Sequence, residues 1–572
     1  MGPVQVVRRV PTDIRAGLLG FIFGAWLIGF RNLSPRSLEW LSADARLAQL
    51  GYQFFWRSSW WQFPLDSTPN FGVGWGVGLN QNAYNSLLAL ILKPVAVFFP
   101  DGFQFQGVWI AVCFAMHVII ARRLFVELRL ERGAQVLGVV VVTLTPALFS
   151  RIGTLWHPQL AAHWMILLAL LLYLRNARPL WWSLFCVYAL SVHVYLFLII
   201  FAVALASLCK QPLLRESSDS VAQRFKSLIA NVFGILLPVV VALFVFGFGT
   251  FLTNSSVAGV GFFRMNLLAF INPARENYGY LMGQLPFFVE RTWITEENEG
   301  FAYLGLGVII TGIALLAFVL SARVRLQRQD WPLAVVTVLL FAVALSERLA
   351  IGGREFTLPV PIVLIELRQT VRAATRFSWL ALYLLVILGW WALANLTKRY
   401  LNKRAASLAL LVVAILQVVD VGPGVVTLRN EVSQEKGNYA PDLGSEWSTL
   451  FEQYDNVKIV PSIDPNEDDM DYLPDEREWL ADNRLFQLAW LAAFNDIQLN
   501  YAFCSRPCVD LARESTATTR SELASGNLKP GTIYLFSTEA EWANTSNEWG
   551  LPTRRIDGFF AILGPTADNS TR

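Results

Sequence analysis

The stretch LIANVFGILLPVVVALFVFGFG, residues 228–249, decides the fold because it carries no charge over a length that can cross a bilayer. A transmembrane helix needs roughly 20 apolar residues to span a hydrocarbon core about 30 Å thick. Arg224 and Lys226 stand just before the run. Basic residues gather on the cytoplasmic side of a membrane, so the pattern predicts a transmembrane helix that enters from the cytoplasm.

Similar apolar runs recur along most of the chain. Of its 572 residues, 55% are hydrophobic and 16% are charged, and the mean hydropathy is +0.45. Soluble domains carry about 25% charged residues, so an ordinary soluble enzyme and a disordered chain are excluded over most of the length. We predict an α-helical polytopic membrane protein with about eleven transmembrane helices. The candidate spans are 13–30, 105–121, 134–150, 160–174, 180–194, 195–209, 228–249, 302–321, 331–346, 378–396 and 405–421.

Short basic clusters determine the predicted topology. With the N-terminus in the cytoplasm, every cluster falls on the inner side of the membrane. The clusters are Arg122, Arg123, Arg129 and Arg132; Arg175 and Arg178; Lys210, Arg215, Arg224 and Lys226; Arg323, Arg325 and Arg328; Lys398, Arg399, Lys403 and Arg404. The first span follows three arginines and has no small-residue cleavage site, which predicts a retained signal anchor. An odd number of spans then places the C-terminus outside the cytoplasm.

Charge divides the chain into two predicted domains. Residues 424–572 hold 12 Lys/Arg and 24 Asp/Glu, whereas residues 1–423 hold 34 and 19. We predict a transmembrane domain over 1–423 and a small soluble α/β domain outside the cytoplasm over 424–572. The transmembrane domain has long external loops at 31–104, 250–301 and 347–377. In the tail the pattern predicts strands at Val457–Pro461, Ile497–Phe503, Thr532–Phe536 and Phe559–Leu563, and helices at Glu476–Phe494 and Thr519–Leu528.

Cys504 and Cys508 are the two cysteines of the acidic domain. A zinc site needs further ligands, and residues 424–572 contain no His. A location outside the cytoplasm favours a disulfide, and the sequence leaves open whether these two cysteines form one.

The first external loop begins with a segment of helical pattern. Leu47, Leu50 and Phe54 share one helical face, which predicts an amphipathic helix on the membrane surface. Asp44 lies in its first turn, where the helix dipole favours an acid. The alternative role is a carboxylate that acts as a base or metal ligand in an external cavity.

Two further segments of this loop have distinctive patterns. The alternating glycines of 72–78 lack the flanking strand and helix of a phosphate-binding fingerprint, so we predict a flexible or tightly turning loop. Residues 86–99 are apolar, are too few for a span and contain Lys93-Pro94, which predicts an interfacial or re-entrant helix.

Histidines and arginines at predicted external span ends are the other candidates. His157, His163 and His193 either bond to nearby backbone groups or form a polar site for a phosphate or sugar at the membrane surface. In the third external loop, Arg368, Arg372 and Arg376 are spaced by four, which favours one helical face. A solvated helix explains this pattern too, but three arginines there suit an anionic phosphate, whose geometry the guanidinium matches.

These motifs, in this order, resemble the GT-C superfamily of integral-membrane glycosyltransferases. More closely, the chain resembles an uncharacterised bacterial multi-span family assigned to that superfamily. The resemblance covers about 40 to 420. Its motifs are Phe54-Phe-Trp-Arg57, Pro69-Asn70-Phe-Gly72, Lys93-Pro94, Phe103-Gln-Phe-Gln-Gly107-Val-Trp109, His157-Pro-Gln-Leu-Ala-Ala-His163-Trp164, His193-Val-Tyr195, Asn266-Leu-Leu268, Glu299-Gly-Phe-Ala-Tyr303-Leu-Gly305 and Arg372-Ala-Ala-Thr-Arg376-Phe-Ser-Trp379.

The resemblance implies transfer of a sugar from a polyprenyl-phosphate carrier to a glycan, lipid or protein acceptor at the external face of a bacterial cytoplasmic membrane. It implies that Asp44 is the catalytic base or a metal ligand. Known members often carry an acid pair here; this chain has one acid, and Glu299 is the candidate for the second. The candidates for donor phosphate binding are Arg372, Arg376, Arg264, His157 and His163. The candidates for substrate binding are His193, Tyr195, Asn266 and Tyr303.

The expected reaction is a single displacement that inverts the anomeric carbon. The residues themselves establish no cofactor, and a divalent metal, Mg²⁺ or Mn²⁺, stays open. The expected partners are the lipid-linked donor, the acceptor and membrane lipids, with no nucleic acid. Two other functions stay open: a flippase or exporter of lipid-linked sugars, and a non-catalytic subunit of an envelope glycan assembly complex.

Overall fold

The computed structural model describes residues 10–75, 77–153, 156–214, 220–248, 263–273, 279–285, 298–322, 327–361, 373–434, 443–462, 483–502, 509–536, 542–543, 551 and 553–566. The chain divides into two compact units. The helical unit comprises Met1–Trp40, Phe105–Ala242 and Gly259–Glu435. The sheet unit comprises Leu41–Gln104, Leu243–Ala258 and Lys436–Arg572. The sheet unit therefore includes most of the first predicted external loop, which the sequence had placed with the transmembrane domain.

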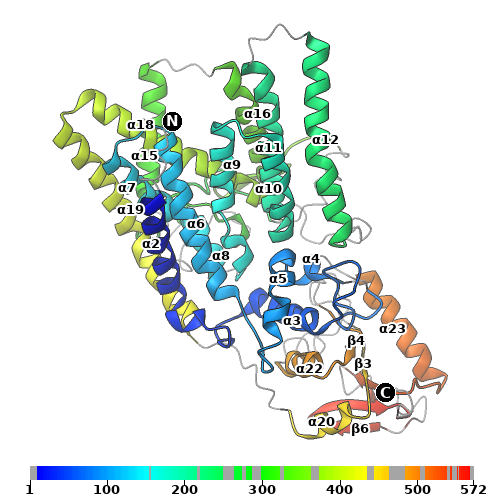
Figure 1. The fold of residues 1–572 in the computed structure, drawn as a ribbon. Coiled ribbons are helices and arrows are strands. Elements are labelled where there is room, and N and C mark those ends of the chain that lie inside the picture. The colour runs from blue at the N-terminus through cyan, green and yellow to red at the C-terminus, as the bar shows by residue number, and fades with distance from the viewer. Residues whose placement is uncertain are drawn as a thin grey trace. The chain divides into compact units, whose positions relative to one another are not determined.

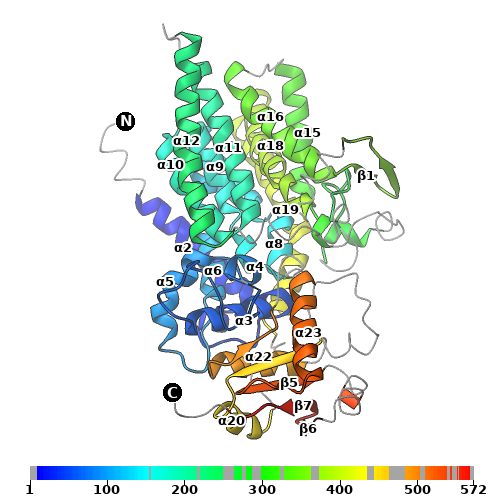
Figure 2. The same ribbon diagram turned by 90° about the vertical axis from the view of Figure 1, so that its right-hand side faces the viewer.

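Helices occupy all eleven segments predicted as spans (Figures 1 and 2). They are α2 (Val10–Ile28), α6 (Gln106–Glu127), α7 (Arg132–Thr143) with α8 (Pro146–Ile152), α9 (Trp164–Leu174), α10 (Pro179–Val192), α11 (Val194–Leu214), α12 (Val221–Val245), α15 (Leu306–Ala322), α16 (Trp331–Leu345), α18 (Trp379–Tyr400) and α19 (Lys403–Val432). Helix α7 meets α8 at a bend of 43°.

Judged by length and composition, fewer helices than the predicted eleven could cross a membrane. Within the described ranges, six helices are long and apolar enough to cross a membrane, or seven if α7 and α8 form one span. Helices such as α9 and α10 are apolar but short, because the chain bends into the polar segments that carry the histidines. The chain is thus mostly helical with about six candidate spans, and the count of eleven stays a prediction.

The pairing of α2 with α6 shows how small residues and charge hold the helical unit together. A Cβ on Gly20 would lie 2.6 Å from the carbonyl oxygen of Phe114, so only glycine permits this close approach of the two backbones. At one end of the pair, the carboxylate of Asp13 accepts hydrogen bonds from Arg122 and Arg123. The basic cluster predicted on the cytoplasmic side is therefore partly neutralised within the unit.

The sheet unit contains a five-stranded mixed sheet in the order β4-β3-β5-β7-β6. Strand β3 (Asn456–Val460) is parallel to β4 (Gln498–Leu499) and β5 (Thr532–Phe536), whereas β7 (Phe559–Leu563) is antiparallel to β5 and β6 (Thr553–Ile556). Figure 2 shows the sheet and the helices of the same unit. These are α3 (Ala43–Arg57), α4 (Leu79–Asn82), α5 (Ser86–Ala96), α20 (Glu446–Phe451), α22 (Asn483–Phe494) and α23 (Val509–Ala524).

The first predicted external loop extends this sheet at its β4 edge. Leu499 donates its backbone N–H to the carbonyl of Asn70 at 2.9 Å, and Val73 donates to the carbonyl of Leu499 at 2.8 Å. Helix α3 is buried along most of its length and packs on α22, so both of its faces serve the core of this unit. The helix predicted over 86–99 is present as α5, while the alternating glycines form part of the edge pairing.

Several predicted features differ or lie outside the description. Helix α23 begins at Val509, well before the predicted start, and strand β6 was not predicted. A two-stranded hairpin in the helical unit, β1 (Arg348–Ile351) and β2 (Arg354–Thr357), was also not predicted. Cys504, Cys508, Arg368 and Arg372 lie outside the described residues.

Candidate functional site in the helical unit

The carboxylate of Glu299 binds two arginines inside the helical unit. Arg151 Nη1 lies 2.7 Å from Glu299 Oε2, and Arg376 Nη2 lies 2.7 Å from Glu299 Oε1. Arg151 also donates to the backbone carbonyl of Glu299 at 3.2 Å, and Arg376 Nε donates to Oε2 at 3.3 Å. We call Arg151, Glu299 and Arg376 the arginine–glutamate cluster.

Three short elements place these side chains. Arg151 lies in the last turn of α8, a helix that begins with Pro146, where the missing N–H costs nothing. Glu299 lies in η4 (Asn298–Gly300), and Arg376 lies in η6 (Ala374–Ser378), directly before α18. All three side chains are almost fully buried. Buried charges persist only when they are paired and hydrogen-bonded, and the short elements deliver that pairing.

The two guanidiniums determine the charge of Glu299. Burial by itself raises the pKa of a carboxyl, because it disfavours the charged form. The charges of Arg376 and Arg151 outweigh burial and hold the pKa of Glu299 well below its usual range, with a smaller contribution from His157. Glu299 therefore stays ionised at neutral pH, which suits an anchor for the guanidiniums better than an acid or base.

Aromatic rings and one histidine surround Arg151. Its guanidinium carbon lies 5.2 Å from the ring centre of Trp379 in α18. The Trp379 ring contacts His163, with ring centres 4.3 Å apart. His163 precedes α9, and its Nδ1 lies 2.8 Å from the hydroxyl of Tyr383. Cation–π contacts of this kind hold a guanidinium in one orientation, so α18 fixes Arg151 and His163 together.

A second set of side chains surrounds Arg376. Its guanidinium carbon lies 4.7 Å from the ring centre of Tyr195, at the start of α11. The Tyr195 hydroxyl accepts a 2.7 Å hydrogen bond from the backbone N–H of Ala373. The backbone N–H of Tyr195 donates to His193 Nδ1 at 3.2 Å. His157 donates its backbone N–H to the carbonyl of Arg151 at 2.8 Å. Six predicted site residues thus meet around one cluster: Glu299, Arg376, His157, His163, His193 and Tyr195.

Arg264 and Asn266 lie at the β1–β2 hairpin. Arg264 pairs with Glu355 of β2. The amide of Asn266 donates to the carbonyl of Gly352 at 2.9 Å and accepts from its N–H at 3.0 Å. Because both side chains bind the hairpin, the geometry favours a structural role for them. The backbone of Arg264 passes close to the cluster, since a Cβ on Gly300 would lie 3.0 Å from the Arg264 carbonyl.

Tyr303 binds an acid on α19. Its hydroxyl donates to Asp420 Oδ2 at 2.7 Å, in the buried core. The same carboxylate accepts the backbone N–H groups of Met282, at 3.0 Å, and Leu306, at 2.8 Å. The Tyr303 hydroxyl therefore connects α19 to the start of α15, which favours a structural role here too.

Asp44 belongs to the sheet unit, in the first turn of α3, and is half-buried. Arg372 lies outside the described residues. In the part of the chain that the structure describes, no three His, Cys, Asp or Glu side chains come together as metal ligands. The described residues thus offer no ligand set for the metal that the resemblance allowed, and the proposed reaction does not use one.

Arg151, Trp379 and Tyr383 were missing from the sequence-based site. Arg151 gave one usable signal: it follows an apolar run at the end predicted to be external, where the positive-inside rule disfavours an arginine. Its partner Glu299 is 148 positions away, and a single sequence gives no sign of such a pairing.

No curated protein matches the chain. Residues 17–422 match the family described as "Domain of unknown function (DUF6311)", and residues 446–564 match its C-terminal domain. The first match covers well over half of the chain, so the protein belongs to the DUF6311 family.

Proposed function

We propose that this protein is an integral-membrane glycosyltransferase of the GT-C type, which transfers a sugar from a polyprenyl-phosphate donor to a cell-envelope acceptor. The observation that carries the proposal is the arginine–glutamate cluster, buried in a unit of apolar helices and surrounded by histidine and aromatic side chains. Ionisable residues at such depth are costly, and they usually mark a functional site.

The cluster is suited to a phosphate-bearing lipid. Guanidinium groups bind phosphate through paired N–H donors, and aromatic neighbours hold them in place. Arg151 and Arg376 are held by one carboxylate, so their orientation is set before a ligand arrives. Preorganised donors of this kind stabilise charge that develops in a transition state. Glu299 acts here as a positioning residue.

The proposed reaction is a single displacement. The base is the one that the resemblance implies, Asp44, which accepts the proton of an acceptor hydroxyl while that oxygen bonds to the anomeric carbon. The bond between this carbon and the phosphate oxygen breaks, and polyprenyl phosphate leaves with its electron pair. Arg376 and Arg151 stabilise the departing phosphate, and His163 or His157 orients the phosphate or the sugar. The anomeric configuration inverts.

The test uses the full chain in nanodiscs with a panel of radiolabelled polyprenyl-phosphate sugars, and follows release of free polyprenyl phosphate. We expect release by the wild type. Asp44→Asn lowers kcat by about 10²-fold or more, as for loss of a general base, whereas Asp101→Asn, an exposed acid of the same external segment, has no effect. Undiminished transfer by Asp44→Asn refutes the assignment of the base.

Two matched arginine substitutions, one in the cluster and one outside it, test the role of the cluster. Arg376→Lys keeps the charge but removes the fork, so we expect the KM for the lipid donor to rise, while Arg354→Lys on the exposed hairpin leaves it unchanged. Movement of sugar-lipid between leaflets with no release from any donor contradicts the transferase and establishes a flippase.

A further inference from the structure

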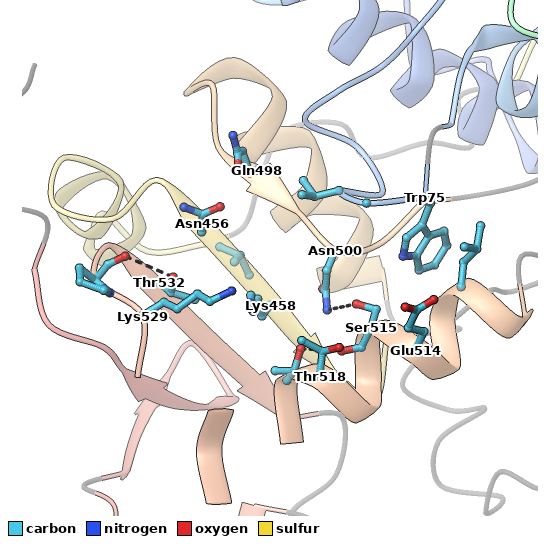
Figure 3. A pocket seen from close by; sticks show the side chains of 16 residues that line it. Trp75, Asn456, Lys458, Gln498, Asn500, Glu514, Ser515, Thr518, Lys529 and Thr532 are labelled. Carbon is cyan, nitrogen blue, oxygen red and sulfur yellow. Dashed lines mark hydrogen bonds between the residues drawn. The ribbon is translucent and has the colours of Figure 1, made fainter. Parts of the chain in front are cut away.

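The sheet unit contains an open pocket of about 440 Å³ that the proposed reaction does not use. Figure 3 shows its lining. One wall is the sheet, through Lys458 and Asn500; another is α23, through Glu514 and Thr518; the segment around Trp75 closes one end. The volume falls within the ~300–1,000 Å³ typical of small-ligand sites.

A tight turn brings Trp75 to this pocket. The N–H of Trp75 donates to the carbonyl of Gly72 at 2.9 Å, and Gly74, between them, has φ +85°. That combination is a type II turn, which requires glycine at its third position. Gly72 has φ +68°, and a Cβ there would lie 2.8 Å from the Cβ of Ala502. The alternating glycines thus allow the first external loop to join the sheet and to carry Trp75 with it.

The sheet side of the pocket is rigidly built. Asn500 Oδ1 accepts the N–H of Ile459 at 2.7 Å, and its Nδ2 donates to the Ile459 carbonyl at 3.1 Å and to Ser515 Oγ at 3.2 Å. The last of these bonds joins the sheet to α23, as Figure 3 shows. These three bonds hold the Asn500 side chain between β3 and α23, so the fold itself builds this wall of the pocket.

Charge in the pocket is balanced, which argues against an anionic ligand. Lys458 and Lys529 share the carboxylate of Glu522, with Nζ–O distances of 2.6 and 2.7 Å. Glu514 contributes a second negative charge at the lining. The charges of the two lysines are therefore balanced by those of two carboxylates. The pocket has no net positive charge that would attract a phosphate or an acidic peptide. A neutral ligand fits this balance better.

The side-chain groups that remain available to a ligand in this pocket are of the kinds that hydrogen-bond to hydroxyl groups. Among the described residues, the side chains of Gln498, Glu514 and Thr518 have no hydrogen-bond partner, and all three line the pocket. Trp75 is 4% exposed, and its indole N–H has no partner among these residues either. Figure 3 shows the nitrogen edge of the indole turned toward the pocket. A buried N–H without an acceptor is destabilising, and a ligand oxygen would supply that acceptor.

We propose that this pocket binds a neutral glycan, of the size of a mono- or disaccharide unit. Amide, carboxylate and hydroxyl side chains bond pairs of sugar hydroxyls, while an indole provides both an apolar surface and a donor. The proposal stands on the pocket alone and does not depend on the transferase activity.

The test is saturation-transfer NMR with the full chain in nanodiscs and a panel of neutral disaccharides: maltose, cellobiose, mannobiose, lactose and chitobiose. We expect at least one to bind. Glu514→Gln and Trp75→Ala weaken that binding at least tenfold. Two matched controls leave it unchanged: Asp510→Asn, an exposed acid on α23 outside the lining, and Trp61→Ala, an exposed tryptophan of the same external segment.

Three results overturn the proposal. One is no binding of any of the five disaccharides by a folded wild-type protein. Another is equal binding by wild type and Glu514→Gln, a variant that keeps the shape of the side chain and so tests the site if Trp75→Ala does not fold. The third is stronger binding of inorganic phosphate than of every disaccharide, with the same sensitivity to Glu514→Gln. Loss of donor turnover by Asp44→Asn with retained disaccharide binding separates this site from the proposed reaction.

Discussion

Arg151 and Arg376 approach the same carboxylate, that of Glu299, each at 2.7 Å from its nearer oxygen. The three residues come from α8, η4 and η6, so this one group joins segments that are far apart in the chain. A buried pair of this kind adds little stability compared with apolar residues, but removal of one partner is expensive because it leaves an unpaired buried charge.

Glu299→Gln is therefore expected to destabilise the helical unit strongly. It leaves two guanidiniums near each other without their carboxylate, and losses of about 3–5 kcal/mol follow when a buried pair is broken in this way. Thermal unfolding of the purified protein in detergent measures the change. Glu355→Gln is the control, because the Glu355 side chain is 26% exposed and its loss is expected to cost less. An equal loss of stability in both variants contradicts the importance assigned to the cluster.

Tyr303→Phe and Asp420→Ala test whether Tyr303 is structural. The phenylalanine variant loses one hydrogen bond, worth about 0.5–1.5 kcal/mol, and leaves Asp420 with two backbone donors. The alanine variant leaves a hydroxyl and two N–H groups without their acceptor, so its unfolding temperature should fall considerably further. In donor-release assays Tyr303→Phe should keep the wild-type KM. A raised KM with unchanged stability means that Tyr303 binds substrate.

Gly72→Ala and Gly74→Ala should differ although both positions have positive φ. At Gly74 a Cβ meets no atom within 4 Å, so alanine suffers only backbone strain of about 1 kcal/mol. At Gly72 the same strain is joined by the clash with Ala502. Hydrogen–deuterium exchange in the peptides over 70–75 and 498–502 reports on the edge pairing. We expect faster exchange in Gly72→Ala than in Gly74→Ala, and the reverse order contradicts the turn assigned here.

Sequence patterns predicted elements well where one local property decides them. Apolar runs marked every long helix of the helical unit, because burial in lipid or protein demands continuous apolar residues. β5 and β7 have their predicted bounds, since β-branched and aromatic residues dominate both. The middle of α23 is rich in Ser and Thr, which favour no single state, and β6 carries two arginines that obscure its pattern. The hairpin β1–β2 did carry a signal, its Gly352-Gly353 turn, which the prediction did not use.

The site was harder to predict than the fold. Arg376 and Glu299 were both candidates, but their mutual ion pair changes what each can do. Glu299 was a candidate for a second catalytic carboxylate, and in the structure its two cationic neighbours keep it ionised. Asn266 and Tyr303 belong to sequence motifs, yet both bind distant backbone or side-chain groups that a local pattern cannot indicate. A single sequence does not show which distant residues contact each other.

The burial of Asp66 predicts that the stability of the sheet unit depends on pH. Asp66 is buried beside α4, and one of its oxygens accepts the N–H of Asn80 at 3.0 Å and the hydroxyl of Ser86 at 3.2 Å. Its other oxygen has no partner among the described residues. Burial raises the pKa of Asp66 from 3.8 to about 7, despite the two hydrogen bonds, which lower it.

The sign of the effect follows from proton binding. Between about pH 4 and pH 7 the folded unit retains the Asp66 proton, while the unfolded chain releases it, so the stability of the sheet unit falls as the pH rises. The loss is complete above about pH 7 and is on the order of 4 kcal/mol, at 1.36 kcal/mol for each pKa unit. Asp66→Asn keeps an acceptor for Asn80 but cannot ionise, so it removes this slope. Hydrogen–deuterium exchange of peptides over 60–90 at pH 5 and pH 8, corrected for intrinsic rates, measures it. Asp101→Asn, exposed in the same segment, should retain the wild-type difference, and parallel behaviour of Asp66→Asn and wild type contradicts the assignment of the buried proton.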